Sequence, residues 1–301
     1  MSPDIANLVF SDGLFDFHTT LLKIIRDETY DNHLDLKLHC VQIFSNLLST
    51  EDRKLTTSQL LETLLSFVKN YDGELRICSL NLISIIAAHD ENCILLSEVS
   101  TDLLEQIINN IGSSDLYLQK DALITLGHLS VVEDSRMAIT KPSLHLLEKL
   151  ENLIVKAPKD TLEQALNILI NLCIPEETLS AISKHPISLL EAMIGVISTE
   201  SENNRMKALT VVANLSFIKE NCTTLVSPSF GLISKLVEIV TDNNISPGEE
   251  IDALVIISNM MTDDRNVAIL SSTELGLIQS LDLSMRRKSL IKKTKGNTYK
   301  M

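Results

Sequence analysis

The chain has 301 residues, and its composition is aliphatic: 45% of the residues are hydrophobic, only 4% are aromatic, and tryptophan is absent. The net charge is −14, but it is unevenly distributed. After Leu283 there are seven basic residues and no acidic one, so the preceding part carries 19 basic and 40 acidic side chains, a net charge of −21. We do not expect nucleic-acid binding by this acidic part, because phosphate contacts need Lys and Arg.

The cysteines and the apolar segments indicate in which cellular compartment the protein is expected. Five cysteines are scattered along the chain without a close pair, which is typical of a reducing compartment. The N-terminus lacks the basic start and the long apolar core of a signal peptide, and no apolar run approaches the roughly 18 residues of a membrane span. We expect a cytoplasmic protein without a membrane span, and the basic end of the chain leaves a nuclear location open.

Apolar residues recur with a helical period along the chain, starting with a helix expected over 14–27. The stretch 90–132 shows a complete unit of three helices, with a cap before the second and a break before the third. The helices are expected at 90–99, 103–111 and 116–132, with Thr101 or Asp102 as cap, Gly112 as break and 113–115 as a new cap. The following units repeat this organisation: the stretch 137–157 leads into 161–174, 187–197 leads into 203–218, and 231–240 leads into 248–261.

The third helix of each unit carries a repeated motif. It has a small residue and, six positions later, usually an Asn followed by an apolar residue. The small residues are Cys40, Ser79, Ala122, Ala165, Ala208 and Ala253, at intervals of 39, 43, 43, 43 and 45 positions. A helical period of this length indicates an α-solenoid, in which no unit buries its apolar face alone. We therefore expect an all-α fold that offers a binding surface.

The repeats resemble those of the armadillo family. The motifs that carry the resemblance are Gly231-Leu232-Ile233 with Leu236-Val237, Gly276-Leu277-Ile278, Ala165…Asn171-Leu172, Ala208…Asn214-Leu215 and Ala253…Asn259-Met260. The resemblance spans about residues 15–282. It implies a right-handed α-solenoid of about six armadillo-type three-helix repeats, with a HEAT-like solenoid as the alternative. Residues 1–284 would form the array, with degenerate end repeats, and 285–301 a basic tail that we expect to be disordered.

In armadillo repeats the third helices line a concave groove, so the resemblance implies a row of partner-binding side chains there. The row consists of Asn46, His128, Asn171, Asn214 and Asn259, and the second repeat has Ile85 at this position. An Asn amide both donates and accepts hydrogen bonds, so it can bind the backbone of an extended peptide. The alternative is structural, because an Asn late in a helix often pairs with nearby backbone, and His128 can also bond locally.

Other features narrow the choice of function. The nuclear-import receptors of the family carry Trp one turn before the Asn, and this chain has none, so we do not expect it to recognise import signals. The seven histidines lack metal-ligand spacing on one helix, and HExxH, P-loop, GxSxG and GxGxxG motifs are absent. We therefore expect no metal, no cofactor and no enzymatic activity.

These features predict a non-enzymatic scaffold or adaptor that holds a protein partner, through an extended or basic segment, in its groove. The alternative is a regulator or chaperone of small GTPases, since some armadillo proteins have that role and an acidic array can attract a basic segment. The tail can be a solvated end, a nuclear-targeting or nucleic-acid-binding patch, or a segment that docks on acidic surface. Arg286-Arg287-Lys288-Ser289 resembles a basophilic kinase site, which makes Ser289 a candidate phosphosite.

Overall fold

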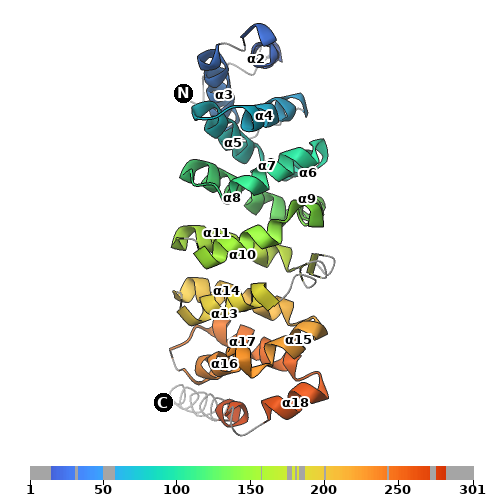
Figure 1. The fold of residues 1–301 in the computed structure, drawn as a ribbon, viewed down its shortest axis with the longest axis vertical. Helices are drawn as coiled ribbons and strands as arrows, with labels where there is room; N and C mark the ends of the chain where they lie inside the picture. Colours follow the sequence, from blue (N-terminus) through green and yellow to red (C-terminus); the bar gives the residue numbers. More distant parts are fainter. Residues whose placement is uncertain are drawn as a thin grey trace, which may run out of the picture. The chain divides into compact units, whose positions relative to one another are not determined.

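The computed structural model describes residues 15–30, 33–49, 58–156, 158–174, 178–179, 182, 187–199, 201–242, 244–271 and 276–282. Within these ranges the chain consists of α-helices and three short 3-10 helices, without any β-strand (Figure 1). This confirms the all-α prediction. The chain divides into two compact units, Met1–Leu153 and Ile154–Met301, and each is described by itself. The predicted tail, with Ser289, lies outside the described residues.

The first unit contains the helices up to α9, and α10 crosses its boundary. The bounds are α2 (Phe15–Arg26), η1 (Glu28–Tyr30), α3 (Leu34–Leu48), α4 (Ser58–Asn70), α5 (Glu74–Ile86), α6 (Asp90–Val99), α7 (Thr101–Asn110), α8 (Leu116–Val131), α9 (Glu133–Ile139), η2 (Pro142–Leu144) and α10 (Leu146–Lys156). The three helices predicted between residues 90 and 132 are present as α6, α7 and α8, so the predicted three-helix repeat is confirmed there.

The second unit continues the same order. Its elements are α11 (Lys159–Leu172), α13 (Ile187–Thr199), α14 (Glu202–Leu215), α15 (Lys219–Leu225), η3 (Pro228–Phe230), α16 (Leu232–Thr241), α17 (Pro247–Met260) and α18 (Asp264–Leu270). Helices α15, α16 and α17 have 7, 10 and 14 residues, so this repeat runs from a short to a long helix. None of the helices in the described ranges is both long and apolar enough to span a membrane.

Consecutive third helices pack against one another through their small residues. In the first unit α3 contacts α5 and α5 contacts α8, and in the second unit α11 contacts α14 and α14 contacts α17. The small residues of the motif are all buried: Cys40, Ser79, Ala122, Ala165, Ala208 and Ala253. A small side chain lets two helix backbones approach, while neighbouring Leu and Ile side chains fill the grooves between ridges. The repeated motif is therefore a packing requirement.

Helix α7 shows how the second helix of a three-helix repeat contributes to the core. Its apolar side chains Leu103, Leu104, Ile107 and Ile108 are buried, and Ile111, directly after the helix, is buried as well. Their spacing places them on one stripe of the helix, which faces the rest of the unit. Each such side chain stabilises the fold by roughly 1.5–3 kcal/mol through its removal from water.

Helix ends in the first unit follow capping chemistry. The carboxylate of Asp115 accepts hydrogen bonds from the backbone N–H groups of Tyr117 at 2.9 Å and Leu118 at 3.3 Å, so the predicted cap of α8 is confirmed. The predicted cap of α7, Thr101 or Asp102, is wrong. The hydroxyl of Ser100 accepts from the backbone N–H of Asp102 at 3.0 Å. Ser100 has extended backbone and is the last residue outside the helix, which is where a cap belongs.

The glycines of the motifs that resemble armadillo repeats have a backbone role. Gly231 precedes α16 with φ of 67°, and Gly276 has φ of 64°. Both lie in the left-handed region, which glycine enters without a steric penalty from a Cβ atom. His145 adopts φ of 52° immediately before α10, so this turn recurs without glycine.

Candidate functional site

The predicted row of polar side chains lies on the third helices of successive three-helix repeats. In the first unit Asn46 lies on α3, Ile85 on α5 and His128 on α8, near the C-terminal end of each helix. Asn46 is exposed, whereas Ile85 and His128 are half-buried. Because α3 contacts α5 and α5 contacts α8, these residues occupy the same register on neighbouring helices. Asn46 is thus available to a partner, and the row is interrupted by the apolar Ile85.

His128 has a distinctive electrostatic environment. Burial lowers the pKa of its imidazole, the carboxylate of Asp90 opposes this effect, and nearby His89 reinforces it. Asp90 begins α6, which contacts α8, so the start of a first helix borders this row position. At neutral pH the uncharged imidazole offers one donor and one acceptor, the same hydrogen-bonding capacity that an Asn amide would bring.

In the second unit the row consists of Asn171 on α11, Asn214 on α14 and Asn259 on α17, and all three are half-buried. Nδ2 of Asn259 donates to Oγ of Ser216 at 2.9 Å, which ties α17 to the end of α14. The side chain of Asn214 has no hydrogen-bond partner within the described part of the chain. The same sequence position therefore has a structural contact in one repeat and an unused amide in another.

One turn before the row, polar side chains connect neighbouring third helices. In the first unit Nδ2 of Asn81 on α5 donates to Oδ1 of Asp121 on α8 at 3.3 Å. Burial raises the pKa of the Asp121 carboxyl, and the hydrogen bond from Asn81 opposes this effect. Nε2 of Gln42 on α3 reaches Oε1 of Glu74 on α5 at 3.5 Å.

The second unit has stronger connections of the same kind. Nζ of Lys207 on α14 donates to both Oε1 of Glu163 and Oδ1 of Asn167 on α11, each at 2.8 Å. The hydrogen bond from Lys207 is the main cause of a lowered pKa at Glu163. Oγ1 of Thr210 donates to Oδ2 of Asp252 on α17 at 2.6 Å. These contacts connect three neighbouring third helices one to two turns before the row.

The sequence analysis did not predict these contacts. The one available signal was a polar or charged residue some 40 positions away, for example Lys207 relative to Asn167. That distance is close to one repeat of 43 positions, so side chains of adjacent third helices come within hydrogen-bonding reach.

Comparison with known proteins establishes the fold. No protein-family model and no curated protein matches the chain. Among solved structures, a computationally designed armadillo repeat protein for modular peptide recognition matches with a TM-score of 0.64 at 14% identity, over 80% of this chain and 98% of that one. A designed armadillo repeat protein in complex with the peptide (KR)4 matches with a TM-score of 0.62 at 13% identity, over 80% and 98%. An engineered protein matches with a TM-score of 0.70 at 16% identity, over 93% and 66%.

The chain has an armadillo-like repeat fold. The armadillo interpretation of the sequence repeats is thereby confirmed at the level of fold, since the identities of 13–16% show the fold alone. Within this fold the Asn and His row lies on the third helices, as the resemblance implies.

Exposed apolar side chains accompany the row of the armadillo-like repeats, and sequence reasoning missed them. Val131, Ile174 and Phe217 are 59%, 65% and 66% exposed. Each follows its row residue by three positions, and they are separated by one 43-residue repeat. Single exposed apolar residues are ordinary on protein surfaces, but here they recur in register. The ends of these third helices therefore offer apolar contact area beside the polar row.

Two further properties of the described residues concern their metal-ligating side chains and their thiols. They contain no group of three or more His, Cys, Asp or Glu side chains that could hold a metal ion. The cysteines are free, and burial raises the pKa of the Cys93 thiol to about 11 and of the Cys173 thiol to about 12. Such thiols stay protonated at neutral pH and are poor nucleophiles. What the described row can supply is hydrogen bonding and apolar contact.

Proposed function

We propose that this protein is a non-enzymatic interaction scaffold that holds an extended segment of a protein partner along its third helices. The observation that carries the proposal is the half-buried amide of Asn214, which has no hydrogen-bond partner in the described chain and lies between two Asn residues of the same row. An amide in this setting can donate to and accept from a peptide backbone whatever the side chains of the peptide are. The proposal includes no cofactor.

Two further observations support a partner segment that is extended and basic. One solved structure with this fold contains the peptide (KR)4, and another was designed for modular peptide recognition. The chain before residue 284 carries a net charge of −21, which would attract a basic segment and would lose this attraction as salt increases. The cytoplasm, with or without the nucleus, is the location we propose for this interaction.

The experiment begins with the selection of a binding peptide from a display library of linear peptides. The selected peptide is labelled with a fluorophore and serves as the probe. Its affinity is measured by anisotropy for the wild type, for Asn214→Ala and for Asn109→Ala, an exposed Asn on the second helix α7 as matched control. We expect Asn214→Ala to weaken binding about tenfold, the effect of one or two hydrogen bonds, and Asn109→Ala to leave it unchanged. Equal affinity of both variants and the wild type would contradict the role of the row.

Regulation of small GTPases is the second candidate, and the acidity of the chain is the observation that favours it. A GTPase with a basic C-terminal segment would use the same attraction as a basic peptide. Nucleotide exchange on purified GTPases, measured with and without this protein, separates the two candidates, because a passive scaffold leaves the exchange rate unchanged.

A further inference from the structure

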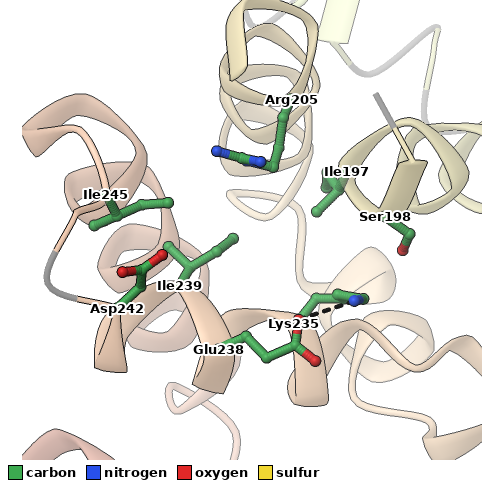
Figure 2. A pocket seen from close by; sticks show the side chains of 8 residues that line it. All are labelled: Ile197, Ser198, Arg205, Lys235, Glu238, Ile239, Asp242 and Ile245. Carbon is green, nitrogen blue, oxygen red and sulfur yellow. Dashed lines mark hydrogen bonds and ion pairs between the residues drawn. The ribbon is translucent and has the colours of Figure 1, made fainter. Parts of the chain in front are cut away.

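A cavity of about 170 Å³ opens in the second unit, at a distance from the row. It lies where the end of α13 meets the first turn of α14 and the last turns of α16 (Figure 2). Three isoleucines, Ile197, Ile239 and Ile245, provide its apolar walls. Arg205 enters it from α14, nine residues before Asn214, which is about 13 Å along the helix. The cavity and the row are therefore at opposite ends of α14.

Arg205 is held in place by a buried carboxylate. Its Nε donates to Oε1 of Glu249 at 2.6 Å, and the Glu249 side chain is fully buried. The other carboxylate oxygen of Glu249 accepts from the backbone N–H and the hydroxyl of Ser246, at 3.2 and 2.8 Å. The Nη groups of Arg205 have no hydrogen-bond partner among the described residues, and Figure 2 shows the guanidinium extending over the cavity. These N–H groups are oriented and can donate hydrogen bonds to a ligand.

The remaining charges of the cavity are mostly neutralised. Nζ of Lys235 donates to Oε2 of Glu238 at 2.9 Å (Figure 2). One oxygen of Asp242 accepts from the backbone N–H of Asn244 at 2.8 Å, and within the described ranges this carboxylate has no ion-pair partner. With both cations paired to acids, Asp242 leaves a negative charge and an acceptor at the rim.

This arrangement selects against both kinds of ion. An anion would meet the unpaired carboxylate of Asp242, and the positive charge of Arg205 is already compensated by Glu249. A cation would pair with Asp242 but would offer no acceptor to the Nη groups of Arg205. A neutral group that accepts from Arg205 and donates to Asp242 satisfies both free positions without a net charge.

We propose that this cavity binds a primary carboxamide, the side chain of Asn or Gln from a protein partner. The amide oxygen would accept from the Nη groups of Arg205, the amide nitrogen would donate to Asp242, and the methylene groups would lie against the isoleucines. The volume is sufficient, since an apolar cavity of about 150 Å³ accommodates benzene, which is larger than a carboxamide. The inference does not depend on the proposed function of the row.

The test uses the full chain with ¹³C-labelled isoleucine δ1 methyl groups and four small probes. Acetamide is expected to shift the signals of Ile197, Ile239 and Ile245 in a saturable way, while buried Ile83 of the first unit stays unchanged as control. Acetate and ethylammonium should need concentrations at least about tenfold higher. N-methylacetamide, a mimic of the backbone peptide group, should also bind more weakly, because one of its N–H positions is blocked.

Each other result overturns the proposal. If acetate or ethylammonium binds as tightly as acetamide, the cavity is an ion site, and if no probe gives a saturable shift, it is no binding site. If N-methylacetamide equals acetamide, the assignment to a side-chain amide is wrong.

A pair of variants tests the role of the Asp242 carboxylate as hydrogen-bond acceptor. In Asp242→Asn the side-chain oxygen can still accept from the backbone of Asn244, but a donor replaces the free acceptor. We expect acetamide affinity to fall about tenfold. Ser198→Ala, which alters a side chain that also borders the cavity, should bind acetamide like the wild type. Circular dichroism verifies that both variants are folded, and unchanged acetamide binding by folded Asp242→Asn would refute the proposed geometry.

Discussion

Nδ2 of Asn259 donates to Oγ of Ser216 at 2.9 Å, although the two residues are 43 positions apart in the chain. The hydroxyl of Ser216 in turn donates to the backbone oxygen of Ala213 at 2.7 Å, so the amide of α17 is connected to the last turn of α14. Asn214, one repeat earlier, has no equivalent side-chain contact within the described residues. The row thus combines a structural contact with an amide that remains available.

This difference predicts effects of different size on stability for two similar substitutions. Asn259→Ala should lower the free energy of unfolding by about 1 kcal/mol, because it removes a hydrogen bond between two repeats. Asn214→Ala should change it by less than about 0.5 kcal/mol. Denaturant unfolding measures both values, and Asn259→Ala combined with Ser216→Ala completes a double-mutant cycle. Additive effects in the cycle would show that the contact has no energetic role.

The buried pair of Arg205 and Glu249 should be important for the second unit. Glu249→Ala removes the partner of Arg205 and also the two bonds that the Glu249 carboxylate accepts from the backbone N–H and the hydroxyl of Ser246, so we expect a loss of about 3 kcal/mol in stability. Glu238→Ala is the control, because the pair of Glu238 with Lys235 is more exposed and should contribute less than about 1 kcal/mol. Thermal or denaturant unfolding gives the comparison, and equal effects would contradict the assigned roles.

His128 should make stability depend on pH. Burial lowers its pKa in the folded state from the ordinary 6.5, so the unfolded chain takes up a proton first as the pH falls. The contribution is therefore fully present above about pH 6.5 and is lost progressively as the pH falls below it. His128→Asn, which does not titrate, should flatten this dependence, as measured by unfolding midpoints between about pH 8 and pH 5. An unchanged pH profile in the variant would exclude His128 as the source.

The cysteines should differ in their reactivity in the folded protein. Cys78 is half-buried, whereas Cys40, Cys93, Cys173 and Cys222 are buried. We expect a thiol reagent to modify Cys78 first and the others only on unfolding, with Cys173 strongly protected because its pKa is raised to about 12 by burial. Mass spectrometry locates the modified residues, and Cys78→Ser should abolish labelling of the native protein. Early modification of Cys173 would mean that α11 opens more readily than its packing implies.

The sequence predicts those features that depend on local chemistry or on the repeat. The cap predicted at 113–115 is confirmed at Asp115, because its short carboxylate can accept from the N–H groups of the following turn. Gly231 of the armadillo-type motif directly precedes α16 with positive φ, which glycine adopts readily. The repeat also predicts which residues share a position on neighbouring third helices, and the contact of Asn259 with Ser216 joins two such helices. Ser100 as the cap of α7 was missed because several adjacent residues can cap, and only the backbone conformation selects one.

Features that depend on side-chain direction could not be predicted. The connection of Lys207 to Glu163 and Asn167 requires the exact offset of two packed helices, which a residue count does not provide. The cavity beside Arg205 depends on how α13, α14 and α16 meet. No motif in the sequence indicates it.

The most direct test of the central claim observes the side-chain amides of the row while a peptide binds. With ¹⁵N-labelled protein and a peptide selected from the library, the NH₂ signals of Asn214 should shift and saturate with the dissociation constant found by anisotropy. The NH₂ signals of exposed Asn109 on α7 should stay in place. Saturated binding of the peptide without any change in the signals of Asn171, Asn214 and Asn259 would contradict the claim that this row holds the partner.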